Sequence, residues 1–172
     1  MIPLLDIGII EAAPLLLAAV RSRVSISMLS DAIANSPVWE RVRERGLAQG
    51  GRSVVIYWGK TENEVTLDIG VEVTEPFCGD DDLQCIAAPA GRAVTATHTG
   101  PTHLLPRVHE RIRAWSAEGE RKLAGVNWEV YASPAGDPAE HRTQVFYLLN
   151  EPKAKSPVRK KWPRFNERSR ST

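Results

Sequence analysis

The residue best suited to chemistry is Glu129, which lies in the segment Asn-Trp-Glu-Val-Tyr at 127–131. The segment is predicted to be a strand, and alternation places Trp128 and Val130 on one face and Glu129 and Tyr131 on the other. We expect Trp128 and Val130 to face the helices, so that Glu129 and Tyr131 point into a groove. A carboxylate among aromatic rings is partly desolvated, so it can attract a cationic ligand or act as a general base toward water. From the segment alone, a solvated or salt-bridged glutamate on an open sheet face is the more common outcome.

Other aromatic residues are candidates for lining the same groove, although core packing is their usual role. Tyr57 leads them, because an internal repeat described below places it near the position of Tyr131. Phe146 and Tyr147 are neighbours on a predicted strand, and the sequence leaves open which of them faces the groove. The remaining aromatic candidates are Trp58 and, on a helix, Trp39.

The histidines and cysteines predict no metal centre. His103 and His109 share a predicted helix but lie six residues apart, which turns them about 240° around the axis. His98, near the end of a strand, is a groove candidate, although a structural role is more common. Cys78 and Cys85 are too few for a zinc site or a disulfide framework. The sequence therefore predicts no cofactor, and its thiols suit a reducing cytoplasm.

Hydrophobic periodicity predicts two helical stretches among short strands. The first covers residues 27–46 and is interrupted at Pro37, and the second covers 101–119 and ends at Gly119. Alternating or apolar runs predict the strands, which lie at 15–24, 54–58, 64–73, 83–88, 92–99, 127–131 and 143–149. The order from 15 to 149 is essentially strand, helix, strand, strand, given twice.

A fixed-offset match supports an internal duplication. Trp39 matches Trp115 at an offset of 76, and the same offset relates Leu29 to Leu105 and the Leu-Ala pair at 47–48 to that at 123–124. Two such units side by side predict an α+β fold. It has tandem β-α-β-β repeats, one curved antiparallel sheet, two helices on one face and a central ligand groove.

Charge divides the chain unevenly. Residues 151–172 hold eight Lys or Arg and two Glu, whereas residues 1–150 carry a net charge of −5. We expect one domain over 1–150, with repeats at about 15–74 and 83–149, and a basic tail over 151–172. The tail interleaves Trp162 and Phe165 with basic residues. That pattern can contact nucleic acid or an acidic protein, but a solvated extension or one that packs back on the domain is favoured. No run of residues suits a membrane span.

In the order of its motifs, the chain resembles the GyrI-like effector-binding domain, the small-molecule module of AraC- and MerR-type regulators. The resemblance rests on Gly91, the Thr-Gly-Pro of 99–101, the Trp-Glu-Val-Tyr of 128–131, the Asp-Pro of 137–138 and the Asp-Ile-Gly-Val-Glu-Val of 68–73. It covers roughly residues 15–149. The family implies a cytoplasmic fold with an aromatic-lined pocket for bulky, often cationic or planar molecules, and a buried glutamate at the position of Glu129. No helix-turn-helix is present in the sequence, so we expect a stand-alone form.

Three hypotheses for function follow from the resemblance. The first is a binder of a bulky, largely apolar or aromatic xenobiotic or antibiotic, giving detoxification or self-resistance. The second is a hydrolase in which Glu129 activates water against a reactive ligand, such as a cyclopropane-containing DNA alkylator, while Tyr131 donates a hydrogen bond. The third is an inhibitor of a DNA topoisomerase. The sequence leaves open whether the protein is a monomer or a homodimer.

Overall fold

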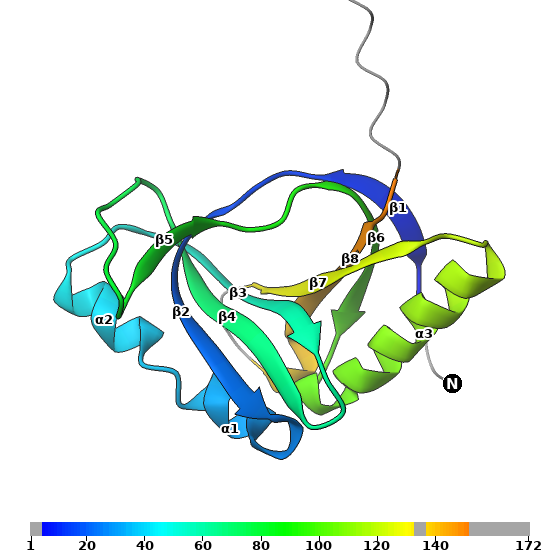
Figure 1. Ribbon diagram of the computed structural model, residues 1–172, viewed down its shortest axis with the longest axis horizontal. Helices are drawn as coiled ribbons and strands as arrows, with labels where there is room; N and C mark the ends of the chain where they lie inside the picture. The colour runs from blue at the N-terminus through cyan, green and yellow to red at the C-terminus, as the bar shows by residue number, and fades with distance from the viewer. Residues whose placement is uncertain (1–4, 133–136, 152–172) are drawn as a thin grey trace, which may run out of the picture.

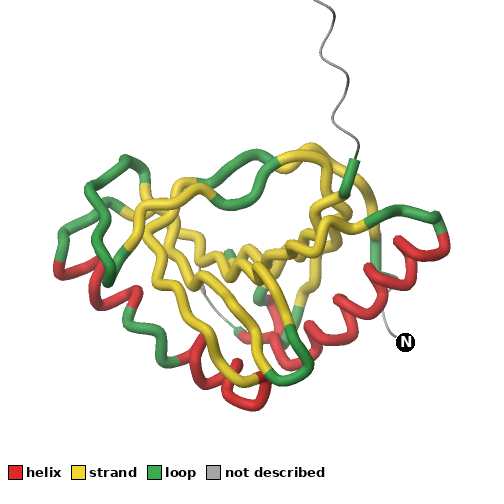
Figure 2. Tube along the Cα trace, in the orientation of Figure 1, coloured by secondary structure: helices red, strands yellow, loops and turns green. Residues whose placement is uncertain are grey.

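The computed structural model describes residues 5–132 and 137–151. Its strands form one eight-stranded antiparallel sheet with the α-helices against one face (Figures 1 and 2), which confirms the predicted α+β class. The elements in chain order are β1 (Ile7–Ala12), β2 (Leu16–Ser25), η1 (Ile26–Met28), α1 (Leu29–Ala34), α2 (Val38–Glu44), β3 (Gln49–Lys60), β4 (Glu64–Val73), β5 (Gln84–Ala87), β6 (Gly91–Thr99), η2 (Thr102–Leu104), α3 (Leu105–Glu118), β7 (Leu123–Tyr131), η3 (Pro138–Glu140) and β8 (Arg142–Leu149). The basic tail from residue 152, and residues 133–136 of the predicted loop, lie outside the described residues.

The strand order is β1-β6-β8-β7-β3-β4-β2-β5. Exchanging each strand for its counterpart in the other half (β1 with β5, β6 with β2, β8 with β4, β7 with β3) gives the same order read from the opposite edge. The edge strands cross over, because β1 pairs with β6 of the second half and β5 pairs with β2 of the first. The register keeps the offset of 76: Ile9 faces Val94, and Ala18 faces Cys85. The sheet therefore has an approximate twofold axis at its centre, between β3 and β7.

The sequence does not predict β1. Five of its six residues keep part of their surface exposed, so it lacks the alternation of a half-buried strand. It is held at the edge of the sheet by a six-residue ladder to β6.

The helical layer differs between the halves. In the first half the helix is broken between α1 and α2, at the predicted Pro37, whereas α3 runs on without a break. Val38 and Val42 of α2 are fully buried, as is Ile112 of α3. Trp39 is 40 % exposed, while its counterpart Trp115 packs at the edge of the core beneath the guanidinium of Arg121.

Both faces of the curved sheet are buried, and this overturns one expectation. Trp128 and Val130 do not face the helices. They pack with Phe146 in a core on the opposite face, where the Trp128 and Phe146 rings stack with centroids 4.9 Å apart. Residues from the edge strands and their connections complete this core, among them Ala12 and Ala88. Glu129 and Tyr131 therefore point to the helix side.

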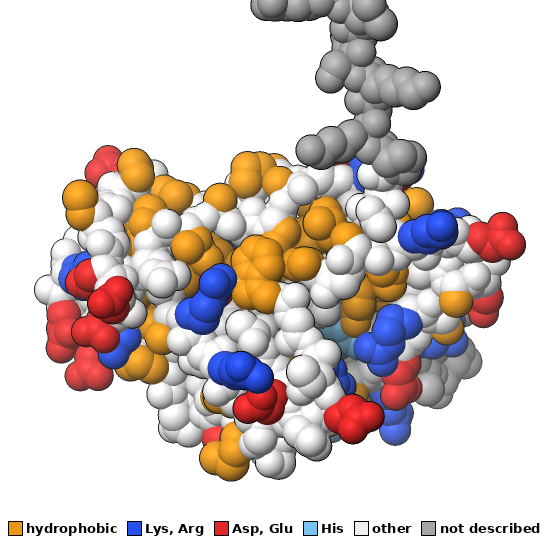
Figure 3. Space-filling model, viewed as in Figure 1, with side chains coloured by type: hydrophobic (Ala, Val, Ile, Leu, Met, Phe, Trp, Pro, Cys, Tyr) orange, Lys and Arg blue, Asp and Glu red, His pale blue; other side chains and the backbone are white. Residues whose placement is uncertain are grey.

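The acidic run after Cys78 anchors the α2 end of the molecule, where acidic side chains gather in Figure 3. Arg45, which caps the C-terminal end of α2, bonds the carboxylate of Asp80, and Arg41, one turn earlier in α2, bonds the backbone carbonyl of Asp82. Cys78 and Cys85 are both free thiols. Over the described residues, no helix has the length and apolar character needed to cross a membrane.

Candidate functional site

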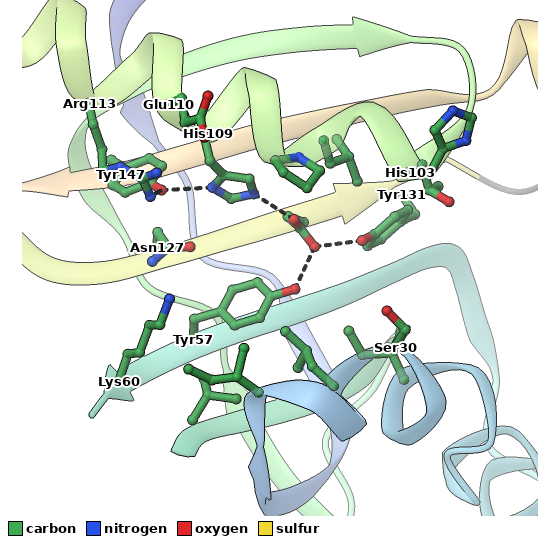
Figure 4. A pocket seen from close by; sticks show the side chains of 18 of the residues that line it. Ser30, Tyr57, Lys60, His103, His109, Glu110, Arg113, Asn127, Tyr131 and Tyr147 are labelled. Carbon is green, nitrogen blue, oxygen red and sulfur yellow. Dashed lines mark hydrogen bonds and ion pairs between the residues drawn. The ribbon is translucent and has the colours of Figure 1, made fainter. Parts of the chain in front are cut away.

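A cavity of about 850 Å³ opens on the helix side of the sheet, between the two halves (Figure 4). The helices α1 and α3 supply its walls, and β3 and β7 supply its floor. Aliphatic side chains such as Leu29, Ile33 and Leu105 line it together with three tyrosines. Lys60, Glu110 and Arg113 also line it and are exposed to solvent. The cavity is therefore a largely apolar space with charged groups toward the solvent.

Glu129 lies at the bottom of this cavity and is only 3 % exposed. Its Oε2 accepts hydrogen bonds from the hydroxyls of Tyr57 at 2.9 Å and Tyr131 at 2.5 Å. Its Oε1 lies 2.7 Å from Nε2 of His109. Three donors on two oxygens are the usual environment of an ionised buried carboxylate.

A chain of hydrogen bonds continues behind the carboxylate. Nδ1 of His109 lies 2.7 Å from the hydroxyl of Tyr147, and that hydroxyl accepts a bond from Arg113 at 3.3 Å. Arginine can only donate, so the single proton of Tyr147 is available for Nδ1. His109 then carries its proton on Nε2, which faces Glu129. A neutral imidazole therefore satisfies every hydrogen bond of this network.

The tyrosines are held in their protonated form. Burial raises the pKa of Tyr57, and the charge of Glu129 raises it further. The pKa of Tyr131 is raised by the same two causes, with burial the larger. Burial also raises the pKa of Tyr147, against the opposing charge of Arg113. Because an ionised phenol beside Glu129 would place two negative charges together, these residues act as hydrogen-bond donors.

The twofold axis passes through this site. Val55 and Glu129 face each other across the β3–β7 ladder, with Ser53 opposite Tyr131 and Tyr57 opposite Asn127. Rotation about the centre of that ladder therefore exchanges Tyr57 with Tyr131 and Ser53 with Asn127. The two symmetry-related phenols converge on one oxygen of Glu129, which lies at the axis.

The family model of the GyrI-like small molecule binding domain matches residues 5–149. The chain belongs to this family. A comparison with curated proteins found no match.

Solved structures share the GyrI-like fold of this chain at low identity. The C-terminal domain of EcmrR has a TM-score of 0.72 and 18 % identity, over 86 % of this chain and 99 % of that domain. SAV2435 bound to tetraphenylphosphonium has a TM-score of 0.59 and 11 % identity, over 84 % and 93 % of the two chains. A hydrolase encoded by lin2189 from Listeria innocua has a TM-score of 0.52 and 9 % identity, over 84 % and 91 %. At these identities the likeness shows the fold alone.

Within this GyrI-like domain, the structure brings only some of the predicted residues together. Glu129, Tyr131, Tyr57 and Tyr147 all line the cavity. Tyr147, and not Phe146, faces it, because Phe146 alternates to the opposite face of the sheet. Trp39 lines a second cavity of about 560 Å³, which shares Ile33, Thr102 and Tyr131 with the first.

Two of the predicted residues lie elsewhere. Trp58 donates its indole proton to Asp68 at 2.6 Å. Nε2 of His98 lies 3.1 Å from the carbonyl oxygen of Pro101 at the turn into η2. Neither side chain lines either cavity.

The sequence analysis missed His109 and Arg113. His109 follows Leu105 by four residues, so it lies on the same face of α3 as the buried Leu105 and Ile112, at its edge. Two features of the sequence could have identified His109 as a site residue: its spacing from Leu105, and its position 76 residues after Ile33. Across the described ranges, no three acidic, histidine or cysteine side chains are grouped as a metal site would need.

Proposed function

We propose that this GyrI-like domain binds a bulky, largely aromatic small molecule in the first cavity and that its preferred ligands are organic cations paired with Glu129. One observation carries the proposal: a carboxylate that is 3 % exposed lies in a largely apolar cavity and is held by donors that need carry no charge.

The second buried carboxylate of the described chain provides the contrast. Asp68 is 1 % exposed, but it is neutralised by a bidentate pair with Arg21, at 2.8 Å for both bonds. Among the described residues, Glu129 has no arginine or lysine paired with it, since its donors are two phenols and an imidazole. Burying an unpaired charge costs free energy. A cationic ligand would recover part of that cost in a setting of low dielectric constant.

The size and surroundings of the cavity fit the same ligand class. A space of about 850 Å³ is within the usual range for drug-sized molecules, roughly 300–1,000 Å³. The binding of tetraphenylphosphonium by SAV2435, which shares the fold, supports a lipophilic cation as the probe. Capture of a xenobiotic or antibiotic in the cytoplasm would lower its free concentration, giving detoxification or self-resistance.

The test compares tetraphenylphosphonium with triphenylphosphine oxide, a neutral molecule of similar aromatic character, by calorimetry. Glu129→Gln should weaken binding of the cation about 10- to 100-fold, because it removes only the charge. It should change binding of the neutral compound little. The fold should survive, because a glutamine amide can donate to His109 in its other tautomer while its oxygen accepts from both tyrosines.

Glu110→Gln is the matched control, since it removes an exposed carboxylate at the rim of the same cavity. Screening by salt makes that charge weak, so affinity for the cation should stay within about twofold. If the parent protein does not bind tetraphenylphosphonium, or if the two variants lose equal affinity, Glu129 is not the counter-charge.

A hydrolase is the second candidate, favoured by the chain of bonds from Glu129 through His109 to Tyr147. Glu129 could take a proton from a water held beside it while the chain keeps the carboxylate in position, and a hydrolase is among the proteins with this fold. Incubation with a cyclopropane electrophile would then yield a water adduct, detected by mass spectrometry. Glu129→Gln should slow that step about a hundredfold or more while binding survives. Equal rates for the variant and the parent would remove Glu129 from the chemistry.

A further inference from the structure

The second cavity lies where the twofold axis places the image of the first. Ser53 and Val55 on its floor correspond to Asn127 and Glu129 on the floor of the first. Ile33 corresponds to His109 at the offset of 76. Tyr131, which lines both cavities, corresponds to Tyr57. The two spaces are therefore halves of one symmetric groove, with Tyr131 and Ile33 between them.

The second cavity differs in chemistry from the first. Valine stands in place of the carboxylate and isoleucine in place of the histidine. Its ionisable side chains are His141 and Arg142, of which Arg142 is exposed. Trp39 forms part of the wall and keeps 40 % of its surface exposed. A cavity with no acidic side chain among its lining residues and with an accessible indole suits a neutral aromatic group.

Thr143 is the residue of this cavity that has a buried hydroxyl without a partner among the described residues. It lines the second cavity and is 1 % exposed. Among the described residues, its Oγ1 has no hydrogen-bond partner. The corresponding residue at the offset of 76 is Leu67, which is fully buried in the core of the first half. Since an apolar side chain fills the equivalent position, folding does not require the hydroxyl, and leaving it unbonded is unfavourable.

We propose that the second cavity is a separate subsite for a neutral aromatic group that bears one hydrogen-bonding atom, held by Thr143 and Trp39. The preferred ligand then has two ends, a cationic end beside Glu129 and a neutral aryl arm across Tyr131. The two-ended ligand rests on the proposed function, whereas the subsite itself is tested without it.

The experiment uses two probes on the full chain, tetraphenylphosphonium for the first cavity and 2-naphthol for the second. 2-Naphthol should bind the free protein and the phosphonium-saturated protein with affinities within about threefold of each other, and it should quench Trp39 fluorescence. Ser53→Phe fills the second cavity and should weaken 2-naphthol at least tenfold, while phosphonium binding stays within about twofold. Asn127→Phe, the symmetry-related change, should have the reverse effect.

Thr143→Val tests the hydrogen bond. It should weaken 2-naphthol about fivefold, the usual effect of one neutral hydrogen bond, and leave naphthalene unchanged. Thermal stability should hold or rise, because an unbonded hydroxyl is removed.

The proposal is overturned if 2-naphthol does not bind, if it competes strictly with the phosphonium, or if it ignores Ser53→Phe. It is also overturned if Thr143→Val lowers the melting temperature and leaves 2-naphthol binding intact. Failure of the phosphonium to bind the parent would instead count against the proposed function, while the 2-naphthol titration still reports on the subsite.

Discussion

The two halves of the molecule share a backbone plan but differ at several positions on the helix side of the sheet. Four apolar residues of the first half correspond to polar residues of the second: Ile33 to His109, Val55 to Glu129, Leu67 to Thr143 and Val71 to Tyr147. The first half shows that apolar side chains satisfy this fold at every one of these positions. The polar set therefore carries a cost that folding alone does not require, and such departures are typical of binding or catalytic sites.

The symmetry between the halves also explains how the carboxylate of Glu129 is held in the core. The symmetry that brings Tyr57 and Tyr131 together gives Glu129 two donors from opposite halves. A duplicated fold thus surrounds one asymmetric residue with a symmetric pair. The carboxylate depends on both halves being in place, so its hydrogen bonds should couple their stability.

The largest expected effect comes from removing that pair of donors. Tyr57→Phe with Tyr131→Phe leaves Oε2 of Glu129 buried without a partner. Hydrogen bonds to charged groups contribute about 1.5–3 kcal/mol each, so the double variant should lose about 3 kcal/mol or more of unfolding free energy near neutral pH. Urea unfolding followed by circular dichroism measures this loss.

Adding Glu129→Val to the double variant gives the second half a valine at the position that corresponds to Val55 of the first half. Most of the loss should be recovered, because the buried charge is removed along with its donors. Tyr147→Phe is the control: its hydroxyl bonds His109 and the exposed Arg113, so it should cost about 1 kcal/mol. If the triple variant is no more stable than the double, the carboxylate does not depend on the two phenols.

The next effect is on stability at high pH. The three tyrosines of the chain all have pKa values raised above 10.0, their ordinary value. The unfolded chain releases these protons above that pH, while the folded chain keeps them. Their contribution to stability is therefore complete below pH 10 and is lost as pH rises toward the folded pKa values, at about 1.4 kcal/mol per pH unit for each tyrosine.

Tyr57→Phe should make that decline shallower by about 1.4 kcal/mol per pH unit. Urea unfolding at several pH values between about 9 and 11 measures the slope. Trp58→Phe, which removes no titrating group, should shift stability equally at each pH. Parallel curves for the parent and Tyr57→Phe would mean that Tyr57 ionises as freely in the folded chain as in the unfolded one.

The sequence predicts the repeated plan and the pairing of Glu129 with Tyr131, because both rest on local periodicity and a fixed offset. It does not predict which face of the sheet meets the helices, since Trp128 and Val130 suit either of two buried faces. The sequence also does not predict that His109 and Arg113 belong to the site. They lie at the edge of a helix face, and their partners Glu129 and Tyr147 are 20 and 34 residues away in sequence. No sequence pattern marks Thr143, because it stands out only through its hydroxyl, which has no hydrogen-bond partner in the described part of the chain.

The smallest expected effect tests whether the twofold symmetry extends to the backbone conformation. Gly51 in β3 and Gly125 in β7 have φ values of 89° and 88°, and each lies where the register of its strand shifts. An L side chain in this region is strained by about 1–2 kcal/mol. A Cβ at Gly125 would meet no atom within 4 Å, so Gly125→Ala should cost that strain alone, and Gly51→Ala should carry at least the same strain.

Gly8→Ala is the control, because its Cβ also meets nothing within 4 Å and its φ is not positive. It should be neutral or slightly stabilising. A Gly125→Ala protein as stable as Gly8→Ala would show that the second bulge is not held in this conformation in solution, and the backbone symmetry of the two halves would fail at that point.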